Sequence, residues 1–402
     1  MRIDVPGDVR EALERLRSRG YTANPVGGCV RDSLLGLCPE DWDICTSARP
    51  EETAACFPDC RVLPTGVRHG TVTVLWSKRS LEITTYRRDG TYSDHRRPDG
   101  VAFVSDLRED LARRDFTVNA MALSPEGEVL DPFGGLADLE KGLLRCVGEP
   151  EVRFREDALR ILRLLRFASR LGFCPEERTL AAALACRDLL PDLAGERVLR
   201  EICLYLEGKT AEDCFPWAKP ILLPVLPELG DLEGEEEAFH LRRLPPSPAL
   251  RLGLLLRSPE GKKADALLRL KSARMLERRV RTLAAGAWGP LPGDRAELGL
   301  VLGRVGEAVF RDLLLLWRAL EAAPEDRLAA VERELESLLR AGFCFSPGDL
   351  SVRSGDLLPM GFSGPELGSL LRSLLEAVQS GALPNEKAAL LRAAEKKKAA
   401  GS

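Results

Sequence analysis

The sequence predicts an α+β fold, in which a small α/β head is followed by an all-helical remainder. Alternating, β-branched segments occur in the first part of the chain, and Leu, Ala, Arg and Glu dominate after about residue 150. The chain has 402 residues, of which 45% are hydrophobic and 30% are charged. This composition is typical of a globular protein, and the length favours several domains.

The head begins with a predicted amphipathic helix over residues 8–19. Val9, Leu13 and Leu16 follow one another at helical spacing, so they share one face. Asp8 is the predicted N-cap, because aspartate accepts hydrogen bonds from the first free backbone N–H groups of a helix. We therefore expect this helix to bury its apolar face on the head.

A β-hairpin follows. Residues 71–76 and 81–86 alternate in polarity and are rich in β-branched side chains, and four residues separate them. This spacing predicts two antiparallel strands joined by a short turn. Residues 88–105 are polar and rich in turn-forming residues, which predicts a mobile loop after the hairpin.

The helical part contains one long predicted helix and two predicted interruptions. Residues 156–171 carry apolar side chains at helical spacing. Residues 231–237 (DLEGEEE) are predicted to form an acidic loop, and Pro245, Pro246 and Pro248 mark a second break. We find no internal repeat of fixed period.

Charge and cysteine content limit the class of protein. There are 58 Lys and Arg against 62 Asp and Glu, and the segment from Arg242 to Arg281 holds twelve basic residues and three acidic ones. Such a segment suits a phosphate backbone, although a solvated helix face has the same composition. The eleven cysteines lack metal-binding spacing, so they are predicted to be reduced thiols. With no signal sequence and no membrane-spanning run, we expect a soluble, cytoplasmic protein.

The strongest chemical signal is the segment GGCVRD (residues 27–32), followed by Asp41 and Asp43. In an extended strand, side chains at i and i+2 share a face, so the two aspartates can hold one Mg²⁺. Gly28 allows close approach of a phosphate to the backbone, and Arg31 supplies a cation for it. These are the residue types that metal-assisted phosphoryl transfer requires. Taken alone, the paired aspartates would more often be an ordinary polar turn.

Glu82 is the candidate for a third carboxylate. It lies in a predicted strand in which Glu82, Thr84 and Tyr86 share one face, away from Leu81 and Ile83. An acidic residue in such a strand usually faces solvent, but next to paired aspartates a catalytic role is favoured.

A second polar cluster is Arg113-Arg114-Asp115, which opens the segment RRDFTVNA. Two adjacent arginines can bind triphosphate oxygens. The alternative is the start of a surface helix with Asp115 as its cap.

A third cluster opens the long predicted helix. Asp157 and Arg160 are one turn apart there, and Arg163 and Arg166 continue the spacing along one edge. An exposed, salt-bridged helix is the ordinary interpretation. The apolar residues on both sides of the arginines favour a cleft instead, in which a carboxylate and a guanidinium can recognise a base edge.

These elements, in this order, resemble the class II CCA-adding enzymes, the tRNA nucleotidyltransferases of bacteria and eukaryotes. The clear matches cover residues 26–202 and 355–391, whereas residues 203–350 are too generic to judge. The segments that carry the resemblance are GGCVRD with DWD, LEITTYR, RRDFTVNAMAL, DPFGGLADL, EDALRILRLLRFASRLGF, GERVLREI, GDLLPMGFSGPELGSLL and LPNEKAALL.

The resemblance implies four segments: a nucleotidyltransferase head at residues 1–146, a neck at 147–202 that carries the nucleotide-selecting helix, and a body at 203–350 and tail at 351–402 that bind tRNA. It implies addition of C, C and A to the 3′ end of tRNA from CTP and ATP, without a nucleic-acid template and with Mg²⁺ as cofactor. It implies that the protein does not associate with a membrane and has no stable protein partner.

The resemblance also assigns roles to single residues. Asp41, Asp43 and Glu82 would be catalytic, with Asp41 and Asp43 as the metal ligands. The residues that would bind nucleotide are Gly28, Arg31, Arg114, Asp157, Arg160, Arg163 and Arg166, and among these Asp157 and Arg160 would pair with the base. Asn119 would support Arg114 within its motif.

Two related activities remain as alternatives. Addition of A alone, with a separate CC-adding enzyme, is compatible with the same motifs. Addition of CC alone is disfavoured, because residues 88–105 keep the loop that such enzymes lack in part, including Arg96-Arg97-Pro98. A poly(A) polymerase is disfavoured because Lys396–Lys398 is the only basic run near the end of this sequence.

Overall fold

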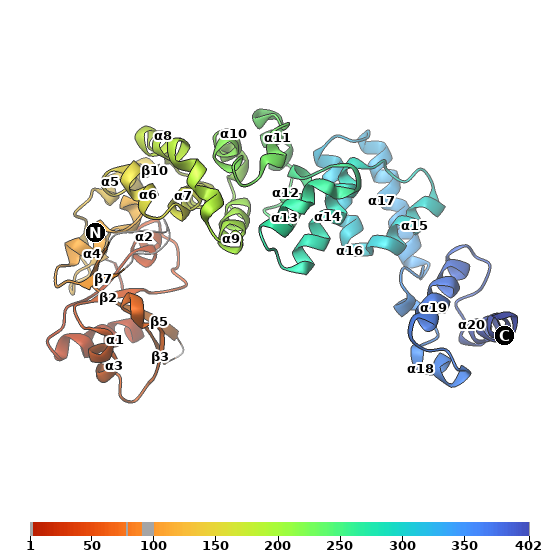
Figure 1. Cartoon of the computed structure of the whole chain (residues 1–402), viewed down its shortest axis with the longest axis horizontal. Coiled ribbons are helices and arrows are strands. Elements are labelled where there is room, and N and C mark those ends of the chain that lie inside the picture. Colours follow the sequence, from red (N-terminus) through yellow and green to blue (C-terminus); the bar gives the residue numbers. More distant parts are fainter. Residues whose placement is uncertain (1–2, 78, 91–99, 402) are drawn as a thin grey trace. The chain divides into compact units, whose positions relative to one another are not determined.

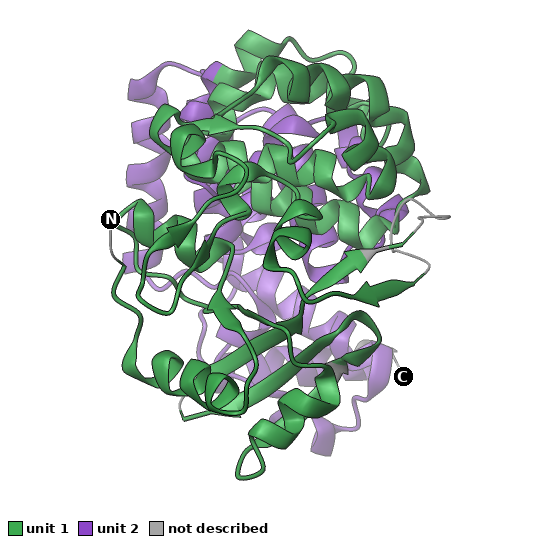
Figure 2. Ribbon diagram, turned by 90° about the vertical axis from the view of Figure 1, so that its left-hand side faces the viewer, with its two compact units in different colours: residues 1–238 green, residues 239–402 purple. Residues whose placement is uncertain are grey.

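The computed structural model describes residues 3–77, 79–90 and 100–401. The chain divides into two compact units, of which unit 1 extends to Ala238 and unit 2 begins at Phe239 (Figure 2). Helix α11 (Gly234–Arg242) contains the point of division. The four segments implied by the resemblance are a finer division and stay a prediction.

A five-stranded mixed sheet forms the centre of the head within unit 1 (Figure 1). Strands β2 and β5 are parallel, whereas each other neighbouring pair is antiparallel. The predicted hairpin is confirmed, since β4 and β5 pair from Thr71 to Trp76. In spatial order the strands are β1 (Ala23–Pro25), β2 (Ile44–Thr46), β5 (Arg79–Thr85), β4 (Thr71–Trp76) and β3 (Arg61–Gly66).

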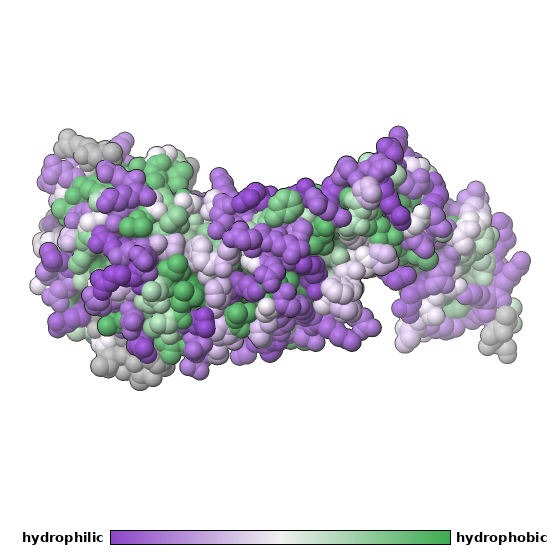
Figure 3. Space-filling view, turned by 90° about the horizontal axis from the view of Figure 1, so that it is seen from above, coloured by the Kyte–Doolittle hydropathy of each residue, from purple (hydrophilic) through white to green (hydrophobic). Residues whose placement is uncertain are grey.

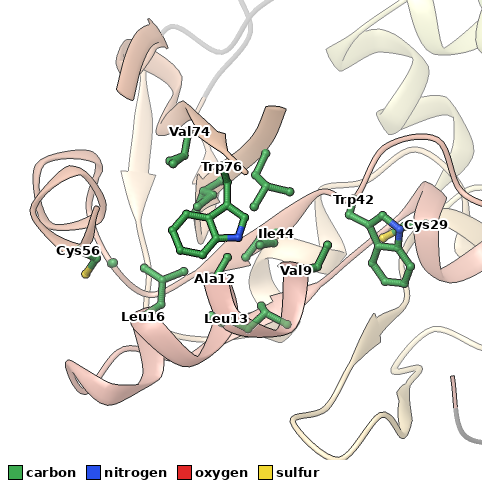
Figure 4. Packing of buried hydrophobic residues seen from close by; sticks show 14 of the residues in the cluster. Val9, Ala12, Leu13, Leu16, Cys29, Trp42, Ile44, Cys56, Val74 and Trp76 are labelled. Carbon is green, nitrogen blue, oxygen red and sulfur yellow. The ribbon is translucent and has the colours of Figure 1, made fainter. Parts of the chain in front are cut away.

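Helix α1 (Gly7–Ser18) covers the sheet with the predicted apolar face (Figure 4). Its buried side chains face Val74 and Trp76 of β4, as the labelled residues in Figure 4 show. The predicted N-cap was wrong. Pro6 occupies the N-cap position, and the Asp8 carboxylate accepts a hydrogen bond from Arg79 Nε at 2.7 Å. Asp8 thus lies inside the first turn, where its Oδ1 accepts the Val9 N–H at 3.0 Å while its Oδ2 pairs with Arg79 of β5.

The described ends of the predicted loop at residues 88–105 are partly in strands. Its ends form an antiparallel pair, β6 (Arg87–Asp89) with β7 (Val101–Phe103). The segment 91–99, which includes Arg96-Arg97-Pro98, lies outside the described residues. The remaining small elements of the head are α2 (Gly28–Leu34), α3 (Pro50–Cys56), α4 (Leu107–Ala112), β8 (Ala122–Leu123), β9 (Val129–Leu130), α5 (Gly135–Lys141) and β10 (Leu143–Leu144).

The rest of unit 1 is mainly helical, and α7 packs along α9. The helix predicted over residues 156–171 is confirmed from Leu159 to Leu171, but it begins three residues later than expected, because α6 ends at Glu156 and α7 begins at Leu159. The predicted acidic loop is confirmed only at residues 231–233. Glu235, Glu236 and Glu237 instead form the first turn of α11, where the helix dipole favours acidic side chains. The elements are α6 (Pro150–Glu156), α7 (Leu159–Leu171), β11 (Cys174–Pro175), α8 (Glu177–Cys186), α9 (Gly195–Leu206) and α10 (Ala211–Leu222).

The described residues of unit 2 are built from helices, so the predicted α+β class with a helical remainder is confirmed. A separate apolar cluster, centred on Leu357, Phe362 and Leu390, holds the last helices together. The elements are α12 (Pro248–Leu255), α13 (Ala266–Arg269), α14 (Arg274–Trp288), α15 (Arg295–Val305), α16 (Glu307–Ala319), α17 (Glu325–Arg340), α18 (Ser354–Leu357), α19 (Gly364–Gln379) and α20 (Lys387–Gly401).

The basic segment from Arg242 to Arg281 is not one free cationic face. Arg251 is buried, and Arg279 forms an ion pair with Asp312 of α16.

Hydrophilic side chains cover much of the surface in Figure 3. Among the described residues, no helix combines the length and the apolar character that crossing a membrane requires.

Candidate functional site

Trp42 anchors the two predicted metal ligands at the start of β2. Its side chain is 4% exposed and lies beside Cys29 of α2 (Figure 4). Asp41 and Asp43 flank this buried residue, and both line the same cavity. Because Ile44 pairs with Ile83 in the parallel β2–β5 ladder, Asp43 lies next to Glu82, one position before the first pair.

The carboxylates crowd one another electrostatically. Burial, together with the nearby charges of Glu82 and Asp41, raises the pKa of Asp43 to about 6, against the opposing effect of Arg114. Glu82 is exposed and does not line the cavity. Within the described residues, no three His, Cys, Asp or Glu side chains form a group that could hold a metal ion. The role of Glu82 stays a prediction.

The sequence predicted that Glu82, Thr84 and Tyr86 share one face of a strand, and this prediction was wrong for Tyr86. Tyr86, which was expected on the open face, is buried and donates a hydrogen bond from its hydroxyl to Asn24 Oδ1 at 2.8 Å. β5 ends at Thr85, so the alternation no longer applies to Tyr86.

Gly27 closely approaches a side chain in the glycine turn, and the predicted contact of Gly28 with a phosphate stays a prediction. Its φ is 80° and its ψ is −125°, and it is the N-cap of α2. A β-carbon added at Gly27 would lie 2.9 Å from Arg114 Nη1. This position was missed in the sequence, although the adjacent pair of glycines was the available signal. Gly28 also lines the cavity, but an added β-carbon there would meet only Arg31 Nη2, at 3.8 Å.

Arg31 is buried and hydrogen-bonded within the protein, which the sequence did not predict. It is 3% exposed, and its Nε donates to Asp32 Oδ1 at 2.8 Å. Its Nη1 donates to Asn119 Oδ1 at 2.6 Å. Arg31 therefore lines the cavity as part of a buried network, and not as a free surface cation.

Asp115 is the centre of that network. It is 6% exposed and accepts hydrogen bonds from Arg163 Nε at 2.7 Å, Asn119 Nδ2 at 3.1 Å and the Phe116 backbone N–H at 2.8 Å. Burial alone would raise the pKa of Asp115, but Arg163 and these hydrogen bonds hold it below its usual value. The interpretation of Asp115 as the cap of a surface helix was therefore wrong.

The residues predicted to read the base lie on either side of a helix break. Asp157 ends α6 with extended backbone, and its Oδ1 accepts the Leu159 N–H at 3.1 Å. This interaction satisfies a free N–H at the start of α7 and explains why the helix does not run through Asp157. Burial raises the pKa of Asp157, against the effect of Arg160 and Arg197. Asp157 and Arg160 therefore reach the cavity without sharing a helix edge.

Arg160 joins three segments. Its guanidinium donates to Glu156 Oε2 at 2.9 Å, to the Arg153 carbonyl at 3.2 Å and to the Arg113 carbonyl at 2.8 Å. It therefore connects α6 and α7 to the segment that precedes Asp115.

Arg166 is held from the neighbouring helix α9, where Glu201 Oε1 accepts from its Nη1 at 3.1 Å. Burial and the charge of Arg163 lower the pKa of Arg166 to about 10. Phe167 lies between the arginines: the guanidinium carbons of Arg31, Arg163 and Arg166 are 5.2, 5.3 and 4.5 Å from its ring centre. Such cation–π contacts order all three side chains.

One cavity of about 540 Å³ in unit 1 brings these groups together. All predicted site residues line it except Glu82. Two further residues around it, Arg113 and Asn119, had been named in the sequence analysis as a phosphate-binding arginine and as a support for Arg114. The remaining residues around it had no predicted role in the site: Gly27, Cys29, Asp32, Glu40, Asp115, Leu159, Phe167, Arg170 and Arg197. Asp115 was missed because its partner, Arg163, is distant in the sequence.

Comparisons with known proteins agree with this arrangement. Residues 24–145 match the family model described as the poly A polymerase head domain. The chain is 36% identical to the CCA-adding enzyme of Lactobacillus delbrueckii subsp. bulgaricus over 387 residues, which is 94% of each chain. It is 35% identical to the CCA-adding enzyme of Enterococcus faecalis, covering 99% of this chain and 98% of that one.

The solved structures include a close match in fold. The crystal structure of the Bacillus stearothermophilus CCA-adding enzyme in complex with CTP has a TM-score of 0.76 and 30% identity, and the match covers 98% of this chain and 97% of that one. The chain therefore belongs to the CCA-adding enzymes, which are tRNA nucleotidyltransferases.

Proposed function

We propose that this protein adds C, C and A in turn to the 3′ end of tRNA, taking CTP and ATP as substrates and releasing pyrophosphate. The observation that carries the proposal is a cavity that Asp41 and Asp43 line together with an array of ordered arginines. Membership of the family supports it, because the names of the relatives describe CCA addition. The same names give no support to the alternative of adding A alone.

In this proposal, Asp157 selects the base. Its carboxylate is acceptor-only when ionised, and both cytosine and adenine present an exocyclic amino group as donor. Uracil and guanine present a carbonyl oxygen at the corresponding position, which an ionised carboxylate repels. Asp157 therefore favours the two nucleotides that are to be added, and Arg160 next to it can donate to a ring acceptor.

The arginines would bind the triphosphate. Arg114 and Arg163 line the cavity and carry planar guanidinium groups that match phosphate oxygens. Phosphoryl transfer depends mainly on positioning and on stabilising negative charge, so side chains that are already ordered suit the reaction.

The donor set also fits Mg²⁺. Asp41 and Asp43 offer the oxygen ligands that this ion prefers, and the raised pKa of Asp43 reflects a crowded site that favours a cation. When bound there, Mg²⁺ would stabilise charge on the transferred phosphoryl group and activate the attacking hydroxyl.

We further propose a reducing compartment, the cytoplasm, as the place of action. All eleven cysteines lie in the described part of the chain, and each is a free thiol. Such a set is typical of proteins kept under reducing conditions.

The test is incorporation of labelled CTP and ATP, with Mg²⁺, into two tRNA substrates. One ends at the discriminator base, and the other already ends in CC. Extension of the first by three residues and of the second by one would support the proposal. Extension of only the CC-ended tRNA would indicate addition of A alone, and extension of neither would refute both.

A further inference from the structure

Asp110 is a buried carboxylate behind the cavity that the reaction itself does not require. It lies in α4, its side chain is 0% exposed, and it does not line the cavity. Both arginines of the RRD segment contact it: Arg113 Nε donates to Oδ1 at 2.9 Å, and Arg114 Nη2 donates to Oδ2 at 3.2 Å. A carboxylate without access to water is expected to be paired, and this one has two guanidinium partners.

The two carboxylate oxygens of Asp110 accept hydrogen bonds from different partners. Oδ1 accepts from Arg113 and, at 3.4 Å, from the Arg87 backbone N–H at the start of β6. These two contacts fix the orientation of the carboxylate, so that Oδ2 faces Arg114. Burial would raise the pKa of Asp110, but the two arginines hold it below its usual value, so the group stays charged near neutral pH.

Arg114 needs such a partner. Its Nη1 lies against Gly27, where a β-carbon would be only 2.9 Å away. Asp43 is a competing carboxylate, since Arg114 already acts on it electrostatically. Without Oδ2 of Asp110, the guanidinium is free to turn towards the catalytic carboxylates.

We propose that Asp110 is a positioning residue that holds the Arg114 guanidinium against the Gly27 turn, in the orientation that receives the nucleotide phosphates. This inference rests on the proposed function, because it takes the cavity to be the nucleotide site. Asp110 acts through Arg114 and touches no substrate itself.

The purely structural alternative is that Asp110 only anchors α4 to the head. The two ideas differ in what happens when Arg114 is absent. If Asp110 acts through Arg114, the effect of Asp110→Asn on nucleotide binding disappears in an Arg114→Met background, since the two residues are then coupled. If Asp110 is only an anchor, the effect persists.

The experiment is equilibrium binding of CTP and ATP to the full chain and to four variants: Asp110→Asn, Arg114→Met, the double variant, and Glu109→Gln. Asparagine keeps the shape of the side chain and removes its charge. Glu109 is the matched control, because it neighbours Asp110 in α4 but pairs with Arg88 at 3.5 Å, in an exposed contact outside the cavity.

We expect Asp110→Asn to raise the dissociation constant of CTP and ATP about tenfold, which corresponds to about 1.4 kcal/mol. Glu109→Gln should leave it unchanged. In the Arg114→Met background, Asp110→Asn should change it less than about twofold. The Michaelis constant for the nucleotides should rise in Asp110→Asn, while that for tRNA stays the same.

Two results would overturn the inference: unchanged nucleotide binding in Asp110→Asn, or an equal loss with and without Arg114. Circular dichroism and the thermal midpoint show whether each variant is folded. If Asp110→Asn does not fold, Asp110→Glu takes its place: it keeps the charge, but its side chain is one methylene longer and moves the acceptor oxygen away from its position opposite Arg114. Nucleotide binding equal to that of the unmodified protein would then refute the inference. An unmodified protein that binds neither nucleotide would refute the proposed function instead.

Discussion

Gly27→Ala separates the stability of the glycine turn from its effect on Arg114. Gly27 has a φ of 80° and a ψ of −125°, a conformation that L-residues rarely adopt. The added methyl group would also lie 2.9 Å from Arg114 Nη1. Because that atom is the end of a flexible side chain, we expect the guanidinium to move while the turn is kept.

Gly20→Ala is the matched control. Gly20 has a φ of 89°, and a β-carbon there would meet nothing within 4 Å. Both variants carry backbone strain of about 1–3 kcal/mol, so both should lower the thermal midpoint by a few degrees. Only Gly27→Ala displaces a cavity arginine.

The size of the binding effect follows from the contact that is lost. A hydrogen bond to a charged group contributes about 1.5–3 kcal/mol, which corresponds to a loss of nucleotide affinity of roughly tenfold to a hundredfold. Equilibrium titration with CTP, in parallel with thermal melting, measures both quantities. An equal loss of affinity in the two variants, or none in Gly27→Ala, would refute the reasoning.

Four further predictions concern the same cavity. Asp41→Ala should abolish incorporation while tRNA binding survives, which filter binding and a primer-extension assay can measure together. Asp157→Ala should reduce discrimination of CTP from UTP by about 1–3 kcal/mol, measured as the ratio of kcat/KM. Phe167→Leu should raise the Michaelis constant for nucleotides several-fold, because cation–π contacts of about 0.5–2 kcal/mol are lost. The pKa of Asp115 is lowered in the folded protein, so its ion pair with Arg163 stabilises fully above the unfolded value near 4, and the stabilisation is lost as the pH falls below it. The difference in thermal midpoint between the protein and Asp115→Asn should therefore shrink below about pH 4.

Each of these four predictions has a result that would contradict it. Turnover in Asp41→Ala would exclude Asp41 as an essential ligand, and unchanged discrimination in Asp157→Ala would place base selection elsewhere. A constant difference in thermal midpoint down to pH 2 would show that Asp115 is not the group that titrates. An unchanged Michaelis constant in Phe167→Leu would show that its ring does not order the arginines.

The parts of the fold that depend on local pattern were predictable from the sequence. The β4–β5 hairpin follows from alternation over a short span, and α1 follows from helical spacing. The break before α7 was not predictable, because it depends on one carboxylate, Asp157, bonding to the Leu159 N–H. Residues 156–171 satisfy the helical pattern whether or not that bond forms.

Site residues could be predicted from the sequence where the residue type alone indicates the chemistry. They could not be predicted where contacts with residues far away in the sequence determine their position. Asp41 and Asp43 stand out as paired oxygen ligands in any context. Asp115 does not, because its main partner, Arg163, is far along the chain. Gly27 differs from Gly28 in its positive φ and in its contact with Arg114, neither of which sequence spacing reveals.

The ion pairs around the cavity have a consequence for repeated turnover. Each of four cavity arginines is held by its own carboxylate, in the pairs Arg31–Asp32, Arg114–Asp110, Arg163–Asp115 and Arg166–Glu201. Ordering an arginine side chain costs about 1.5–2 kcal/mol of conformational entropy, and here folding meets that cost before any nucleotide arrives. The cavity is thus preorganised. An enzyme that binds three nucleotides in succession at one site presents the same rigid array to each, so no nucleotide in the series has to order the arginines anew.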